Sequence, residues 1–154
     1  MRSLRLLLLV SGIVLVAIQF VRPGRNKNEQ VSDSDISKVL SVPDSVLVML
    51  HNTCYDCHSN NTRYPWYSNI QPVGWLLARD ISRGKKQLNF NEFGEYIPRR
   101  QLSKLEGIAD NVRDNTMPLK SYRLIHRSAR LNENEKRLLI NWAERSIDRF
   151  TTTK

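Results

Sequence analysis

The sequence predicts a mostly α-helical protein, in which one soluble domain follows an N-terminal apolar helix. Three observations predict this architecture. Apolar residues in the domain recur at helical spacing, no alternating run is long enough for a β-sheet, and residues 6–21 are nearly all apolar. The chain has 154 residues, of which 40% are hydrophobic and 25% charged, so it suits one domain with an added anchor.

The N-terminal segment reads LLLLVSGIVLVAIQFV over residues 6–21, with Arg2 and Arg5 before it and Arg22 after it. It is slightly short for a membrane span, which needs about 20 residues. It is long for the apolar part of a signal peptide, which has about 7–15 residues, and it lacks a small-residue cleavage site. We therefore predict that residues 1–22 form an uncleaved signal anchor rather than a cleaved signal peptide.

Residues 23–37 are polar, with Pro and Gly near their start, and predict a linker before a domain that spans residues 38–150. The formal net charge is +9, but residues 1–30 alone carry five basic residues and one acid. Much of the positive charge therefore flanks the anchor, where basic residues serve membrane orientation. No long basic run and no recognised motif indicates binding to nucleic acid, so we exclude it as a partner.

In the first half of the predicted domain, a short helix precedes the two cysteines, and a loop and a second helix follow them. Pro43 suits the first turn of a short helix that runs up to Cys54. Residues 59–72 are rich in Asn, Ser, Pro and aromatic residues, and they predict an ordered loop. Residues 73–85 predict the next helix, which Gly84 is expected to end.

The second half of the domain predicts a short connector and two further helices. Phe90 and Phe93 are expected to anchor the connector. Apolar residues between 102 and 112 repeat at helical spacing, and this helix should end near Asn115 because Pro118 blocks its continuation. The last helix begins at a capping box made by Asn132 and Glu135. Its apolar stripe is predicted to comprise Leu138, Leu139, Trp142, Ala143 and Ile147.

Residues 54–58 hold both cysteines of the chain and one of its three histidines, in the pattern C-x-x-C-H. This pattern is typical of covalent attachment of a c-type haem. The thiols of Cys54 and Cys57 would reach the two vinyl groups of the porphyrin, and His58 would be the proximal iron ligand. A disulfide, a thioredoxin-type thiol pair and a zinc site are alternatives. The thiol pair lacks a βαβ context, and only two further histidines are left for zinc.

The sixth iron ligand is predicted to be Met117, which lies 59 residues beyond His58 and directly before Pro118. A Met/His pair raises the reduction potential and favours electron transfer. His126 is the alternative distal ligand. A third possibility is an iron whose sixth position is open. The simpler interpretations are that Met117 fills a gap in the core and that His126 is a hydrogen-bonded structural residue.

Aromatic residues follow the cysteine motif at close spacing, and we predict that they shield the porphyrin from water. The candidates for this haem pocket are Trp66, Tyr67 and Trp75, with Trp142 in the core. Arg63 is the candidate partner of a haem propionate, because it lies in the loop five residues after His58.

Several motifs together resemble the haem-binding domain family, which comprises small exported bacterial proteins. They are Cys54-x-x-Cys57-His58-Ser59-Asn60, Thr62-Arg63-Tyr64-Pro65-Trp66-Tyr67, Pro72-Val73-Gly74-Trp75, Leu88-Asn89-Phe90, Met117-Pro118-Leu119-Lys120-Ser121-Tyr122, Leu131 and Trp142. The resemblance covers residues 38–147 and implies a mostly α, cytochrome-c-like domain around one covalent haem. It implies no particular reaction.

The sequence departs from the family pattern at three positions. Tyr64 stands where the family usually has Trp, Gly74 where Ser is common, and Asp80 where relatives often carry His. An aspartate excludes the ligand role that a histidine could have at position 80, and this strengthens the assignment of Met117.

These observations predict a membrane-anchored protein with a single haem that carries electrons. Because this type of haem attachment belongs on the exported side, the soluble domain should lie in the periplasm and the anchor in the inner membrane. The redox partner is not identified by the sequence. One alternative function is a haem-based sensor or ligand-binding module with a displaceable sixth ligand. A small haem peroxidase ranks last, because only His51 and His126 offer distal acid–base groups.

Overall fold

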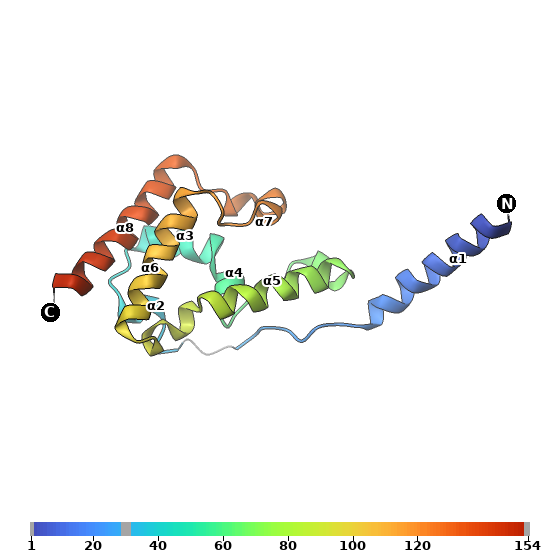
Figure 1. Cartoon of the computed structure of the whole chain (residues 1–154), viewed down its shortest axis with the longest axis horizontal. Coiled ribbons are helices and arrows are strands. Elements are labelled where there is room, and N and C mark those ends of the chain that lie inside the picture. Colours follow the sequence, from blue (N-terminus) through green and yellow to red (C-terminus); the bar gives the residue numbers. More distant parts are fainter. Residues whose placement is uncertain (1, 29–31, 153–154) are drawn as a thin grey trace.

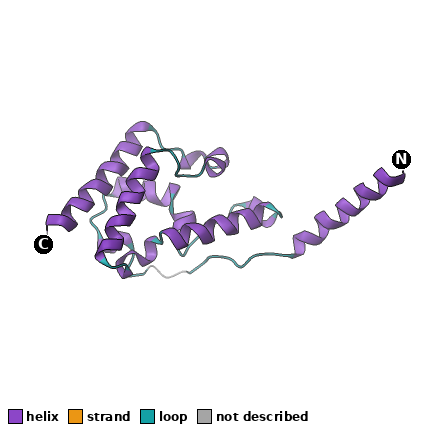
Figure 2. Cartoon of the chain, in the orientation of Figure 1, coloured by secondary structure: helices purple, strands orange, loops and turns teal. Residues whose placement is uncertain are grey.

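The computed structural model describes residues 2–28 and 32–152, and within these ranges most of the chain is helical (Figures 1 and 2). The predicted mostly α-helical class is confirmed. One isolated β-bridge, between Lys27 and Asn61, is the only β pairing among the described residues.

The α-helices in chain order are α1 (Arg2–Ala17), α2 (Ile36–Val39), α3 (Asp44–Thr53), α4 (Tyr55–His58), α5 (Val73–Gln87), α6 (Pro98–Arg113), α7 (Lys120–Ile125) and α8 (Glu133–Thr152). In the described part of the chain, 3-10 turns accompany them: η1 (Ile18–Phe20), η2 (Trp66–Asn69), η3 (Phe90–Glu95) and η4 (Arg127–Ala129).

The core of the domain forms where α6 and α8 lie side by side over α3 and the connector before α6 (Figure 1). Phe90 and Phe93 of the connector are almost completely buried, as predicted. So are Leu50 of α3, Leu105 of α6 and Leu139 of α8. Burial of these large apolar side chains is the main favourable contribution to folding of the domain.

The capping box at the start of α8 is confirmed. The Asn132 side chain accepts hydrogen bonds from the backbone N–H groups of Asn134 and Glu135, and Glu135 accepts one from the Asn132 N–H. The predicted stripe of α8 is wrong at Leu138, which is 49% exposed, whereas Leu139, Trp142 and Ala143 are buried. Leu138 lies one residue, or about 100°, from Leu139 on the helix, and this turns it towards solvent.

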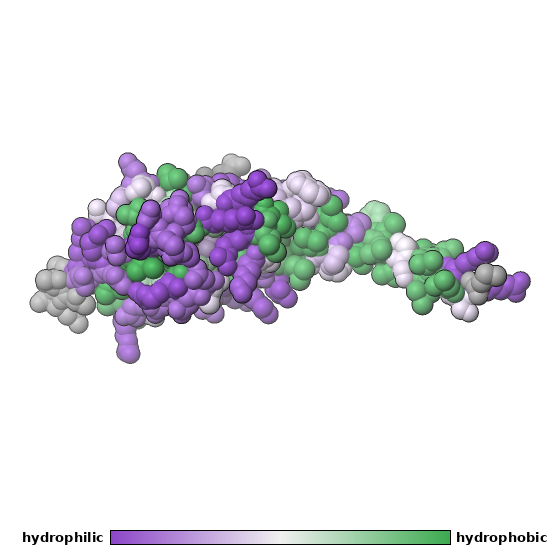
Figure 3. Space-filling view, turned by 90° about the horizontal axis from the view of Figure 1, so that it is seen from above, coloured by the Kyte–Doolittle hydropathy of each residue, from purple (hydrophilic) through white to green (hydrophobic). Residues whose placement is uncertain are grey.

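The apolar α1 helix does not pack into the core. The segment Arg2–Phe20 is 19 residues long with a mean hydropathy of 2.2, and none of it is buried. It is the only helix in the described residues that is long and apolar enough to cross a membrane. Figure 3 shows its hydrophobic surface beside the largely hydrophilic domain. An exposed apolar helix at the N-terminus fits a membrane anchor or a signal sequence, and not a core helix.

The segment predicted as a linker makes several contacts with the domain. The N–H of Asn28 donates to the Asn60 carbonyl, and the N–H of Thr62 donates to the Asn26 carbonyl. Ile36 is fully buried, so the packed part of the domain begins before residue 38, where the sequence placed its boundary. Residues 29–31 of the predicted linker lie outside the described residues.

The structure contradicts one predicted helix end, that of α5, and confirms another, the end of α6 near Asn115. Gly84 does not end α5, which continues to Gln87. A Cβ atom at position 84 would lie 2.5 Å from the Cys57 carbonyl oxygen, so glycine is needed there for close packing of α4 against α5. At the end of α6, Asn115 adopts a left-handed conformation with φ 57°, which asparagine tolerates better than most residues. The helix therefore stops before Pro118 is reached.

Candidate haem site

The C-x-x-C-H motif occupies a break between α3 and the single turn of α4. Cys54 separates the two helices, and its N–H donates to the Leu50 carbonyl at 2.8 Å. The next turn is closed by the N–H of His58, which donates to the Cys54 carbonyl at 2.9 Å. Spacing of three and four residues along this turn brings Cys54, Cys57 and His58 to the same side of the chain. Both thiols are free.

The imidazole of His58 is held by a contact with the backbone of the segment after α5. Its Nδ1 lies 3.0 Å from the Leu88 carbonyl oxygen. Because a carbonyl only accepts hydrogen bonds, Nδ1 carries the proton and Nε2 keeps its lone pair. Burial lowers the pKa of His58, which favours the neutral ring. A histidine that donates its second ring N–H to a backbone carbonyl is the usual arrangement around a protein-bound metal.

A cavity of about 220 Å³ opens beside these three residues. Its walls come from α3 and α4, from α5, and from the segment that follows α6. The lining residues are Thr53, Cys54, Asp56, Cys57, His58, Asp80, Arg83, Gly84, Gln87, Met117, Pro118, Leu119 and Tyr122. Two thiols, an imidazole and a thioether thus meet in one cavity, which is the donor set that a covalently attached haem with Met/His ligation needs.

Met117 reaches this cavity because the chain turns back after α6. The N–H groups of Thr116 and Met117 both donate to the Asn111 carbonyl, at 3.0 and 3.1 Å. Pro118 behind Met117 is buried. The Met117 side chain is 36% exposed, so it lies at the rim of the cavity rather than in the core.

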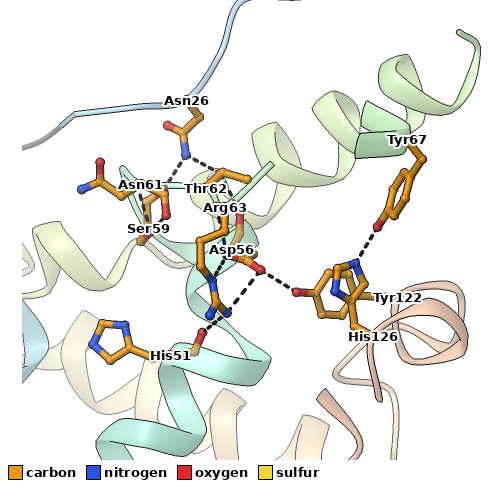
Figure 4. A network of polar contacts seen from close by, with 10 residues as sticks. All are labelled: Asn26, His51, Asp56, Ser59, Asn61, Thr62, Arg63, Tyr67, Tyr122 and His126. Atoms are coloured by element: carbon orange, nitrogen blue, oxygen red, sulfur yellow. Dashed lines mark hydrogen bonds and ion pairs between the residues drawn. The ribbon is translucent and has the colours of Figure 1, made fainter. Parts of the chain in front are cut away.

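Asp56, between the two cysteines, is the centre of a polar network (Figure 4). Its carboxylate is 10% exposed and accepts hydrogen bonds from the backbone N–H and the Nε of Arg63, both at 3.1 Å. It also accepts one from the Tyr122 hydroxyl at 2.6 Å. Burial, together with this hydrogen bond, raises the pKa of Tyr122, so its hydroxyl stays protonated as a donor. Asp56 and Tyr122 both line the cavity, and spacing alone did not identify either one.

His126, the alternative distal ligand, does not line the cavity. Its Nε2 lies 2.5 Å from the Tyr67 hydroxyl, and its ring stacks on Tyr122 with 4.1 Å between centroids (Figure 4). The imidazole of His126 therefore contacts Tyr67 and Tyr122 outside the cavity, whereas Met117 lies in the cavity wall.

The residues predicted to shield the porphyrin lie outside the cavity lining. The Arg63 guanidinium binds Asp56 and the His51 carbonyl, which leaves it turned away from the cavity. Trp66 is 76% exposed and does not line the cavity. Trp75 is half-buried and donates from Nε1 to the Val21 carbonyl, and Tyr67 is bound to His126. Trp142 is buried in the core, as predicted.

The cysteine pair does not form a site for a bare metal ion. Within residues 2–28 and 32–152, no group of three or more His, Cys, Asp or Glu side chains could hold one. Burial raises the pKa of Cys54 to about 11 and that of Cys57 to about 12, so both thiols stay protonated near neutral pH. A structural zinc site needs four ligands, and the described residues around the two thiols do not supply them.

Comparison with known proteins identifies the family. The profile of the haem-binding domain family matches residues 13–145, which is most of the chain and includes the whole cavity. No curated protein and no solved structure matches the chain. By this match the chain belongs to the haem-binding domain family.

Proposed function

We propose that this protein is a membrane-anchored electron carrier of the c-type cytochrome kind, with one covalently bound haem. The observation that carries the proposal is the meeting of Cys54, Cys57, His58 and Met117 in one cavity. Membership of the haem-binding domain family supports haem as the cofactor.

Each residue has a distinct role in this proposal. Cys54 and Cys57 would hold the haem by thioether bonds, formed by their thiols with its two vinyl groups. The Leu88 carbonyl orients His58 as the proximal ligand, and Met117 is the distal ligand. When bound, the haem supplies one-electron redox chemistry, which Met/His ligation directs towards electron transfer.

The proposed location follows from α1 and from the chemistry of haem attachment. The exposed apolar segment Arg2–Phe20 would anchor the protein in the inner membrane. The domain would lie in the periplasm, where thioether attachment to a C-x-x-C-H motif takes place.

The test is to purify the full-length protein from membranes and record its mass and its absorption spectra in both redox states. We expect one haem that stays attached after denaturation, a low-spin spectrum, and the long-wavelength charge-transfer band of methionine-ligated ferric haem. Met117→Ala should lose this band, whereas His126→Ala should keep it. Haem that is lost on denaturation would exclude covalent attachment. A charge-transfer band that survives Met117→Ala would exclude Met117 as the ligand.

One observation favours a second function, a haem-based sensor or ligand-binding module. Because Met117 lies at the rim of the cavity and is 36% exposed, an external ligand could displace it. Rapid binding of carbon monoxide to the ferrous wild-type protein, at the rate seen for Met117→Ala, would support this function over electron transfer.

A further inference from the structure

Positive charge is concentrated on two of the walls that enclose the cavity. One wall is α5, which contributes Asp80, Arg83, Gly84 and Gln87 to the lining. The other is the segment 116–130, whose first half contributes residues between Met117 and Tyr122. These two segments are far apart in the sequence, and the cavity lies between them.

The two walls account for most of the net charge of the chain. Within α5, four basic residues face one acid, and the segment 116–130 has four basic residues and no acid. The net charges are therefore +3 and +4, out of +9 for the whole chain. Since residues 1–30 contribute a further +4, the rest of the chain is slightly negative. The basic residues of these two segments are Arg79, Arg83, Lys85, Lys86, Lys120, Arg123, Arg127 and Arg130. Lys85 and Lys86 lie on another face of α5, where they line a separate cavity beside Asn26, and they do not border the haem cavity.

Most of these cations point to solvent and are not neutralised by nearby acids. Arg79 pairs with Asp80 at 3.4 Å, and this is the only ion pair that the walls make among the described residues. Around the cavity, Arg83, Lys120 and Arg127 are exposed. A surface that gathers unneutralised charge of one sign around a cavity attracts a partner of the opposite sign and speeds its association.

The same two segments also expose apolar side chains. Leu76 is 47% exposed and precedes Asp80 by four residues, so it lies on the face of α5 that borders the cavity. On α7, Leu124 is 74% exposed and Ile125 is 60% exposed. Apolar side chains within a charged rim are the usual composition of a protein–protein interface.

We propose that this basic surface around the cavity is the docking site of an electron-transfer protein that presents an acidic patch. The proposal rests on the proposed function, because the partner would exchange electrons with the haem bound in the cavity. Charge complementarity would bring the two proteins together, and the apolar residues would then form the centre of a short-lived contact.

The first test uses two small redox reagents of opposite charge. The ferrous protein gives one electron to hexacyanoferrate(III), which becomes hexacyanoferrate(II), or to tris(phenanthroline)cobalt(III), which becomes the cobalt(II) complex. We expect the reaction with the anionic reagent to slow as salt is added, and that with the cationic reagent to quicken. The double variant Lys120→Glu, Arg127→Glu should lower the rate with hexacyanoferrate(III) by about tenfold at low salt.

The matched control is Arg99→Glu, Arg145→Glu. It makes the same change in net charge at exposed positions of α6 and α8, away from the cavity. An equal loss of rate in both double variants would show that only net charge matters, and this result would overturn the docking site. Rates that do not depend on salt would overturn it as well.

A second test does not depend on electron transfer. Binding of poly-L-glutamate to the full-length protein in phosphatidylcholine nanodiscs should weaken in the Lys120→Glu, Arg127→Glu variant and not in the control. If the protein carried no covalent haem, the proposed function would fail, and this measurement would still decide the docking site. Binding that disappears in phosphatidylglycerol nanodiscs would show that the basic walls face lipid headgroups, which would overturn a protein partner.

Discussion

The hydroxyl of Tyr122 donates a hydrogen bond of 2.6 Å to the carboxylate of Asp56, across 66 residues of sequence. Asp56 lies between the two cysteines that are proposed to hold the haem, and Tyr122 follows Met117 by five residues. This hydrogen bond therefore connects the cysteine motif, on the proximal side of the cavity, with the segment that contains Met117, the proposed distal ligand. Since the acceptor is charged and 10% exposed, the bond is of the stronger kind.

Replacement of Tyr122 by Phe should remove this hydrogen bond with little change in the volume of the side chain. We expect the free energy of unfolding to fall by about 1–3 kcal/mol, because the buried carboxylate loses a donor. With its segment less constrained, Met117 should leave the iron more often, so carbon monoxide should bind the ferrous protein faster. Flash photolysis and chemical denaturation measure the two effects.

Tyr64→Phe is the matched control for this prediction. The Tyr64 hydroxyl accepts a hydrogen bond from the Asn26 N–H at 2.6 Å, and it does not line the cavity. This variant should lose stability to a similar degree and keep the carbon monoxide rate of the wild type. If both variants bound carbon monoxide at the same rate, Tyr122 would not position the distal segment.

Asp56→Asn tests the charge of the same network. A negative charge beside the cavity stabilises the ferric state, which carries one more positive charge than the ferrous state. Its removal should raise the reduction potential, on the order of tens of millivolts because Arg63 already offsets part of the charge. Redox titration measures the change. Asp110→Asn, at an exposed ion pair with Arg113, should leave the potential as it is in the wild type.

Gly84→Ala should disturb the packing that places the motif. The added methyl group would lie 2.5 Å from the carbonyl oxygen of Cys57 and 3.1 Å from its carbonyl carbon, and backbone atoms cannot move aside cheaply. We expect a loss of about 1–3 kcal/mol in the free energy of unfolding and a smaller fraction of protein with attached haem.

The comparison for this change is Gly107→Ala, which lies inside α6 with nothing within 4 Å of the added Cβ. There alanine should stabilise the protein by about 0.5–1 kcal/mol, because it favours the helix. Equal effects at positions 84 and 107, measured by thermal unfolding, would mean that the close approach of α4 and α5 is not needed.

The sequence predicted the parts of the fold that depend on local chemistry. The capping box at Asn132, the helix before Cys54 and the buried Phe90 and Phe93 follow from spacing and short-range hydrogen bonding. Gly84 shows where this reasoning failed. A glycine late in a helical run usually ends the helix, but here it permits a contact with Cys57, and only the tertiary structure brings that contact about.

In the candidate site too, residues of a local motif could be predicted from the sequence, whereas contacts between distant segments could not. His58 and Met117 were predicted from motif chemistry, and the structure places both beside one cavity. Arg63 was predicted to lie near a propionate because of its position in the sequence, and in the structure its guanidinium pairs with Asp56. Hydrogen bonds between segments that are far apart, such as Tyr122 to Asp56 and Tyr67 to His126, have no periodic signal in a single sequence.

The apolar helix α1 can be tested as a membrane anchor by placing a charge in it. If Arg2–Phe20 crosses the membrane, a charge near its middle should weaken anchoring, because arginine at the centre of a span costs about 2.5–3.5 kcal/mol. We expect Ile13→Arg to release part of the protein from membranes washed with alkaline carbonate. Ser3→Arg, at the end of the helix, should keep it bound. A mature protein that begins after residue 22 would show instead that the segment is a cleaved signal, and N-terminal sequencing of the purified protein decides between the two.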